Sequence, residues 1–192
     1  MSSKNYILEK ITRNIQKRHD RPVVKLDAIT FDNLLTQFVE ISQAVGGHAV
    51  VLEEGQDINA VIRDLYPDAK EISSALKDIT LSTLDPNSVA EATDLKDVDL
   101  AIIEGELGVA ENGCIWIPQE IKHKALYFIT QYLVIVLDKN KIVNNMHEAY
   151  AKIGTNDKGF GVFISGPSKT ADIEQALVVG AHGPKGLTVI LK

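Results

Sequence analysis

The segment with the clearest chemical potential is Ser165-Gly-Pro-Ser-Lys-Thr170, which follows the short apolar run 161–164. Gly166 lets a ligand approach the backbone closely, and the serine and threonine side chains supply hydroxyl groups. Lys169 places a positive charge beside the N–H groups that the start of a helix leaves free. We therefore predict a loop that binds a small carboxylate or phosphate, formed by Ser165, Gly166, Ser168, Lys169 and Thr170.

Two observations limit this interpretation of the loop. Gly161 and Gly166 have the spacing of a P-loop, but Pro167 stands where that motif needs its lysine. Triphosphate hydrolysis is therefore disfavoured. Helix capping is the alternative role of the same residues, because serine and threonine before a helix usually only bond its first N–H groups.

A second candidate site is Glu111-Asn112-Gly113, between the strand-like runs 100–103 and 114–117. The Asn-Gly pair favours a tight turn with positive φ. A carboxylate on such a turn can serve as a nucleophile or a general base. We predict Glu111 as the catalytic candidate, with Asn112 and Gly113 as ligand-binding residues. The alternative is a hairpin turn with a solvated glutamate.

Histidines and cysteine give fewer options. His182, in the Gly/Pro-rich turn 180–186, could act as an acid, a base or an anion ligand near neutral pH. Because it follows the helix expected over 170–179, we place it at the opposite end of the sheet from Ser168. The other histidines lack metal-ligand spacing, so we predict no metal. With one cysteine, Cys114, neither an iron–sulfur cluster nor a Cys-rich zinc site is expected, and the cofactor is left open.

The remaining sequence indicates the elements that position these residues. Continuously apolar runs separated by helix-length segments are typical of an α/β fold with a largely parallel sheet covered on both faces. We expect helices over residues 3–18, 31–45, 58–66, 122–130, 144–153 and 170–179. We expect strands at 49–52, 100–103, 114–117, 133–137, 161–164 and 187–191.

Composition excludes several classes of function. The 192 residues are 45% apolar and 24% charged, as in soluble globular proteins, and 20 basic against 26 acidic residues give a net charge of −6. This balance argues against nucleic-acid binding. The longest apolar run, 133–137, is far too short to span a membrane, and residues 1–10 lack the apolar core of a signal peptide. We expect a cytoplasmic location and no membrane partner.

Two segments also resemble a known family. The run Ile164-Ser-Gly-Pro-Ser-Lys-Thr-Ala-Asp-Ile-Glu174, with the later segment 178–191, resembles the C-terminal signature of the LUD domain, the lactate-utilization protein C family. It adds Asp172 to the candidate residues. The run Ala110-Glu-Asn-Gly-Cys114 resembles the family's AETGT signature, with asparagine and cysteine replacing the two threonines. The resemblance extends from about Val45 to Lys192.

The resemblance implies both a fold and a function. The fold would be a Rossmann-like three-layer sandwich of the NagB/RpiA/CoA-transferase type, with residues 1–46 as a helical segment packed on an α/β domain of residues 47–192. The function would be that of the non-iron–sulfur component of an L-lactate-to-pyruvate system, which binds a small anion and docks onto iron–sulfur subunits. The alternative is a CoA-transferase-like or isomerase-like enzyme that uses Glu111. The N-terminal helices could also form a homodimer surface.

Overall fold

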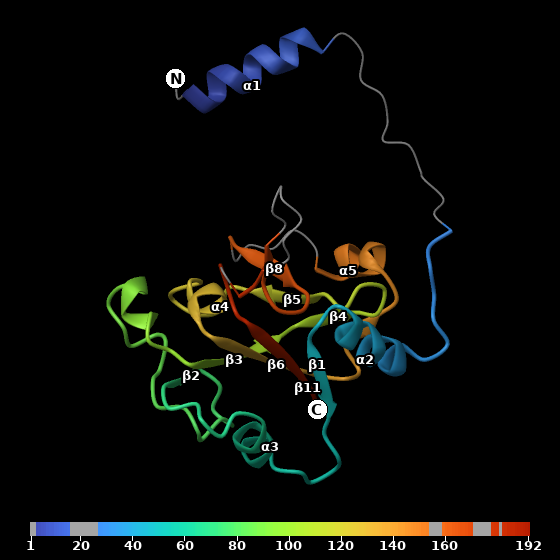
Figure 1. Cartoon of the computed structure of the whole chain (residues 1–192). Helices are drawn as coiled ribbons and strands as arrows, with labels where there is room; N and C mark the ends of the chain where they lie inside the picture. Colours follow the sequence, from blue (N-terminus) through green and yellow to red (C-terminus); the bar gives the residue numbers. More distant parts are fainter. Residues whose placement is uncertain (1–2, 16–26, 154–158, 171–177, 181) are drawn as a thin grey trace.

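A five-stranded parallel sheet forms the centre of the molecule, in the order β1-β11-β6-β3-β2 (Figure 1). The computed structural model describes residues 3–15, 27–153, 159–170, 178–180 and 182–192. The strands are β1 (His48–Val51), β2 (Ile72–Ser74), β3 (Leu100–Gly105), β6 (Tyr132–Leu137) and β11 (Gly186–Leu191). The prediction of an α/β fold with a largely parallel sheet is confirmed.

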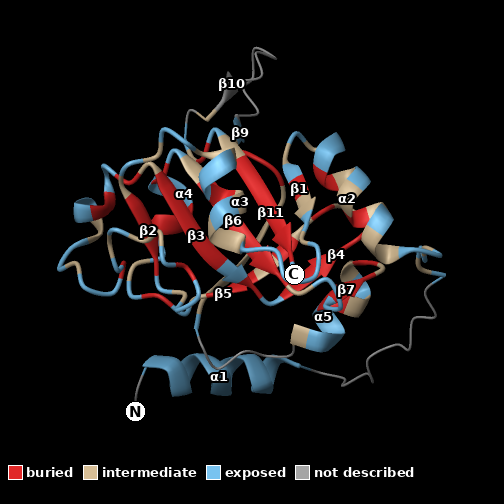
Figure 2. Cartoon of the chain, turned by 90° about the horizontal axis from the view of Figure 1, so that it is seen from below, coloured by how far each residue is buried: buried red, intermediate tan, exposed pale blue. Residues whose placement is uncertain are grey.

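Strand β6 shows why these runs are continuously apolar. Leu133, Ile135 and Leu137 point into one core cluster, whereas Val134 and Val136 point into another on the opposite face of the sheet. Both faces of the strand are covered, so water-compatible side chains have no place along it. Figure 2 shows the central strands as the most continuously buried part of the chain.

One face of the parallel sheet is covered by helix α3 (Ile58–Leu65) and the loops around it. Asp57 caps the helix, because its side chain accepts a hydrogen bond from the Asn59 N–H. Ile62 is completely buried against the sheet. The connection from β1 through α3 to β2 crosses the full width of the sheet, since β1 and β2 are its two edge strands.

The opposite face is covered mainly by a second, four-stranded sheet in the order β7-β4-β5-β8. Its strands are β4 (Leu107–Val109), β5 (Ile115–Pro118), β7 (Ile142–Val143) and β8 (Gly161–Ile164), and α5 (Met146–Ile153) covers its outer side. The two sheets approach so closely that a Cβ on Gly105 would lie 2.4 Å from the Ile115 side chain. Short helical turns, η1 (Ala92–Leu95) and α4 (Leu126–Ile129), complete this layer.

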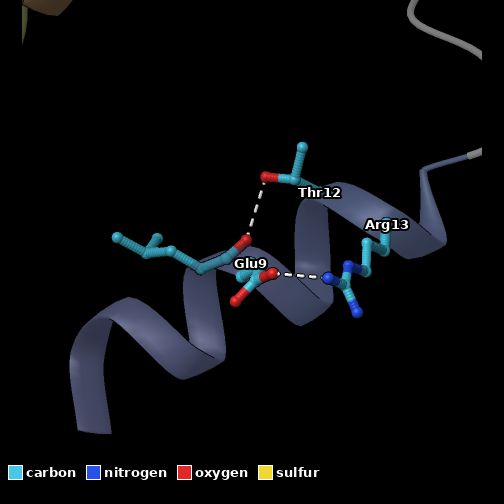
Figure 3. A network of polar contacts seen from close by, with 4 residues as sticks. Glu9, Thr12 and Arg13 are labelled. Carbon is cyan, nitrogen blue, oxygen red and sulfur yellow. Dashed lines mark hydrogen bonds and ion pairs between the residues drawn. The ribbon is translucent and has the colours of Figure 1, made fainter. Parts of the chain in front are cut away.

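The N-terminal segment is only partly attached to the domain. Helix α2 (Leu34–Ala44) packs beside β1 and β7 and buries Phe38. Helix α1 (Ser3–Asn14) has no buried residue and lies away from the sheets in Figure 1, so the packing that we expected for it is not seen. Figure 3 shows contacts within α1, an Arg13–Glu9 ion pair of 2.6 Å and a Thr12 hydroxyl that donates to the Leu8 carbonyl. Within the described ranges, no helix is long and apolar enough to cross a membrane.

The prediction of a helix over 170–179 is wrong for the residues that are described at its two ends. Strand β9 (Lys169–Thr170) pairs antiparallel with β10 (Val178–Val179). Positions 170, 178 and 179 carry β-branched residues, which favour extended backbone over helix. Residues 171–177, and with them the candidate Asp172, lie outside the described part of the chain.

Candidate functional site

The predicted ligand-binding loop borders a cavity of about 230 Å³, called here the 165–168 cavity. Ser165, Gly166 and Ser168 line one side of it, and His182 and Gly183 line another. The apolar part of the wall comes from Tyr127, Phe128, Leu133, Val162, Phe163, Ile164 and Leu187, with Pro167 and Pro184 at the loops. Four of the residues that the sequence singled out therefore meet at one cavity.

Close backbone packing fixes the shape of this loop. Gly166 is buried and has φ of +66°, and a Cβ at this position would lie 2.6 Å from the Val45 carbonyl oxygen. The Ser168 N–H donates to the Pro184 carbonyl (2.8 Å), and the Ser168 carbonyl accepts from the Gly180 N–H (3.0 Å). These bonds hold the loop against the turn that leads into β11.

The position of His182 corrects the prediction that it lies at the opposite end of the sheet from Ser168. Both residues line the same cavity. A Cβ on Gly183 would lie only 2.9 Å from the Ser168 Cβ, so the two loops are in direct contact. The reason is the β9–β10 pairing, which returns the chain to the side from which it left, whereas a helix would have carried it across the sheet.

Lys169 is placed differently from the other loop residues. Its side chain is exposed and is not among those lining the 165–168 cavity. The Lys169 Cε lies beside Gly46, 3.8 Å from the place that a Cβ on that glycine would take. Lys169 and Thr170 form strand β9, so within the described residues Lys169 does not stand at the start of a helix as we expected. The backbone of Thr170 belongs to β9.

The predicted turn at Asn112-Gly113 is present. Strands β4 and β5 pair antiparallel on either side of it, and Gly113 has φ of +68°. Glu111 is exposed, and its Oε2 accepts a hydrogen bond of 3.0 Å from the Met146 N–H at the start of α5. This contact gives the carboxylate a structural role at a helix N-terminus, where negative charge is favourable. Glu111 does not line the 165–168 cavity, and its role as a nucleophile stays a prediction.

Ser165 connects the two motifs. Its hydroxyl donates to the Asn112 carbonyl over 2.8 Å, which ties the β4–β5 turn to the loop after β8. The Asn112 side chain in turn accepts from the Cys114 N–H (3.1 Å). Burial raises the pKa of the Cys114 thiol above its ordinary value; a hydrogen bond with Ser165 partly opposes this, and the charge of Glu111 adds to it. The thiol at this position is therefore neutral near pH 7.

The chemistry available in the 165–168 cavity is binding of a small polar molecule. Serine hydroxyls and an imidazole can donate hydrogen bonds to a carboxylate, while the apolar wall accommodates a methyl group. The volume lies below the usual range for drug-sized ligands, so it suits a molecule of a few heavy atoms. Among the described residues, no group of three or more His, Cys, Asp or Glu side chains is placed to hold a metal ion.

Sequence reasoning missed a larger cavity at the carboxyl ends of the parallel strands. It has a volume of about 560 Å³ and includes Lys77, Glu104 and Lys192. The signal in the sequence was a charged residue at or just past the end of a buried strand: Glu104 near the end of β3, and Lys192 directly after β11.

Comparisons with known proteins agree with this fold. Residues 90–191 match the model of the LUD domain family. The chain is 33% identical over 108 residues to lactate utilization protein C of Bacillus pumilus (strain SAFR-032), covering 50% of this chain and 45% of that protein. It is 26% identical over 153 residues to lactate utilization protein C of Geobacillus kaustophilus (strain HTA426), covering 73% and 61%. The chain thus matches about half of the length of the first relative and three fifths of the second.

A solved structure supports the same architecture. The crystal structure of a DUF162 family protein from Deinococcus radiodurans superposes with a TM-score of 0.63 at 16% identity. The superposition covers 85% of this chain and 99% of that one, so the similarity concerns the fold of almost the whole solved chain. It agrees with a Rossmann-like α/β sandwich. Because the family model covers more than half of its residues, this protein belongs to the LUD domain family.

Proposed function

We propose that this protein acts in lactate utilization as a non-iron–sulfur component that holds a small carboxylate in the 165–168 cavity. The names of the Bacillus pumilus and Geobacillus kaustophilus relatives support the pathway. The family match covers the segment that builds the cavity, since residues 90–191 include both of its loops.

The observation that carries the proposal is the convergence of Ser165, Ser168 and His182 on one small cavity. Among the described residues, the Ser168 hydroxyl and the His182 imidazole are the groups offered to a carboxylate, because the Ser165 hydroxyl already donates to Asn112. The apolar side of the cavity, with the accessible side chains of Phe128 and Val162, would contact the methyl group of lactate or pyruvate. Polar and apolar walls around one small volume suit a three-carbon acid.

Docking onto iron–sulfur subunits is the second part of the proposal. Oxidation of lactate to pyruvate releases two electrons, and one cysteine cannot ligate an iron–sulfur cluster by itself. In the proposed assembly the two electrons pass to clusters carried by a partner, and the two protons that the oxidation also releases pass to solvent. The exposed apolar side chains of α1, among them Ile7, Leu8 and Ile11, supply a surface for such contact.

The test is a calorimetric titration of the whole chain with L-lactate and with pyruvate. Binding should weaken at least about fivefold in Ser168→Ala and His182→Ala, because each removes a hydrogen bond to the carboxylate. His147→Ala is the matched control, since this exposed histidine lies on α5 outside the cavity. Absence of binding in the unaltered protein, or equal affinity in all variants, would contradict the proposed site.

Docking is tested separately by mixing the protein with iron–sulfur subunits of a lactate-utilization system. A stable complex on size-exclusion chromatography is the expected result. Replacement of Ile11 by aspartate should weaken the complex and leave lactate affinity unchanged, because α1 contributes nothing to the cavity. Elution of each protein alone at micromolar concentration would reject docking while leaving the ligand site intact.

A further inference from the structure

The cavity of about 560 Å³, called here the strand-end cavity, has no role in the proposed function. It lies where the parallel strands end, bordered by Leu52 after β1, Glu104 in β3, Val136 in β6 and Lys192 after β11. It shares none of its lining residues with the 165–168 cavity. A ligand in one would not touch the residues that form the other.

Topology explains why the sheet is open here. The connection after β1 runs over the face covered by α3, whereas the connections after β3 and β6 run over the face covered by the second sheet. Neighbouring connections that depart to opposite faces leave a crevice at the carboxyl ends of the strands, where α/β proteins place their ligands. The N-terminal end of α3, with Gln56 and Ile58, forms one wall of this crevice.

The cavity combines an apolar wall with charged groups. Leu52 and Ile58, which are partly exposed, supply most of the accessible aliphatic surface, and the buried Ile79 and Val136 complete the wall. This surface belongs to the core cluster between the sheet and α3, so its shape is set by packing that does not depend on a ligand. A flat ring system laid against it would bury apolar area on a preformed surface.

Two ammonium groups border the same cavity. The Lys192 Nζ lies 3.9 Å from the Glu104 Oε1, and both side chains are about half exposed, at 47% and 51%. At this distance and exposure the pair is weak, so the Lys192 ammonium can turn to another anion at little cost. Lys77 has no ion pair among the described residues, and Asp78 adds one carboxylate.

Glu104 is the unusual residue of the set. Strand β3 is buried at every position except this one, so the carboxylate interrupts a run that the core alone would make apolar. It borders both the strand-end cavity and a neighbouring one of about 260 Å³. A carboxylate in that position can accept hydrogen bonds from ligand hydroxyl groups.

We propose that the strand-end cavity binds an organic phosphate of the size of a mononucleotide. The base lies on the aliphatic wall, the phosphate contacts the ammonium groups of Lys77 and Lys192, and sugar hydroxyls donate to Glu104. The volume falls within the range of small-molecule sites and is more than twice that of the 165–168 cavity. A three-carbon acid would leave most of it empty.

The experiment is a titration of the whole chain with AMP, and in separate arms with adenosine, ribose 5-phosphate and inorganic phosphate. AMP should bind more tightly than each of the other three, because only AMP uses the apolar wall and the ammonium groups together. Lys77→Ala and Lys192→Ala should each lower AMP affinity at least about fivefold and leave adenosine unchanged. Lys96→Ala, an exposed lysine outside the cavity, is the control.

Two further variants separate this site from the proposed lactate site. Ala75→Trp places a large ring in the mouth of the strand-end cavity and should abolish AMP binding while leaving L-lactate affinity unchanged. Ser168→Ala should have the opposite pattern. Unaltered unfolding midpoints confirm that each variant is folded. The inference is overturned if AMP shows no binding at roughly 5 mM, if ribose 5-phosphate or inorganic phosphate binds as tightly as AMP, or if Ala75→Trp leaves AMP affinity unchanged.

Discussion

Replacement of Gly166 by alanine would test the loop geometry on which the 165–168 cavity depends. Two costs add at this position. The backbone has φ of +66°, which costs a residue with a Cβ about 1–2 kcal/mol. The new Cβ would also lie 2.6 Å from the Val45 carbonyl oxygen, a backbone atom that cannot turn away. Relief of this overlap requires the loop or α2 to shift, at a further cost of about 1–3 kcal/mol.

Gly55→Ala is the matched control for this prediction. Gly55 has φ of +80°, but a Cβ there meets nothing within 4 Å, so only the conformational cost applies. Equilibrium unfolding in urea compares the two variants, and with a slope of about 2 kcal/mol per molar urea the midpoint should fall by about 1–2.5 M for Gly166→Ala. For Gly55→Ala the expected decrease is about 0.5–1 M.

The difference between these two variants is the informative quantity. If Gly166→Ala destabilises no more than Gly55→Ala, the loop does not press against Val45, and close packing at Gly166 does not shape the 165–168 cavity. A larger loss for Gly166→Ala, with weaker lactate binding in the fraction that remains folded, agrees with a loop whose close packing shapes the site.

Three further outcomes follow from described contacts. Two backbone N–H groups donate to the Asp99 carboxylate and lower its pKa. The stability that this carboxylate contributes is therefore present above about pH 4 and is lost as pH falls through the lowered pKa. In urea unfolding, the difference in stability between the wild type and Asp99→Asn should shrink over that pH range. Tyr66→Phe removes a hydrogen bond of 2.7 Å to the buried Thr188 and should cost about 1 kcal/mol by the same assay. Burial raises the pKa of the Cys114 thiol, so a disulfide reagent should modify this thiol slowly at pH 7 and quickly in denaturant. Rapid labelling of the native protein would contradict the burial of Cys114.

The parallel sheet was predictable because its signal is local. Runs such as 133–137 are apolar at every position, which happens only when both faces of a strand are covered. The Asn112-Gly113 turn was equally readable, since few residues adopt its positive φ. The brief strands β2, β4 and β7 escaped prediction, because two or three residues carry too little pattern to separate a strand from a loop.

The candidate site was predictable in its residues but not in its arrangement. Ser165, Gly166 and Ser168 do meet at a cavity, yet the helix expected after them is replaced at its described ends by paired strands. Because of this difference, His182 lines the same cavity, whereas the expected helix would have placed it at the far end of the sheet. For Glu111, the sequence indicated the turn beside it but not its partner. Nothing in the sequence shows that its carboxylate accepts a hydrogen bond from the start of a helix 35 residues later.

Strand order has a consequence for how the chain acquires its fold during synthesis. Among the described strands, β1 pairs only with β11, which follows the others in chain order and lies between β1 and β6. Until β11 emerges from the ribosome, β1 has no partner strand and one hydrogen-bonding edge of β6 is unpaired. The nascent protein should therefore be a substrate for chaperones until β11 has emerged, and its folding should be slow, since the decisive pairing joins residues distant in sequence.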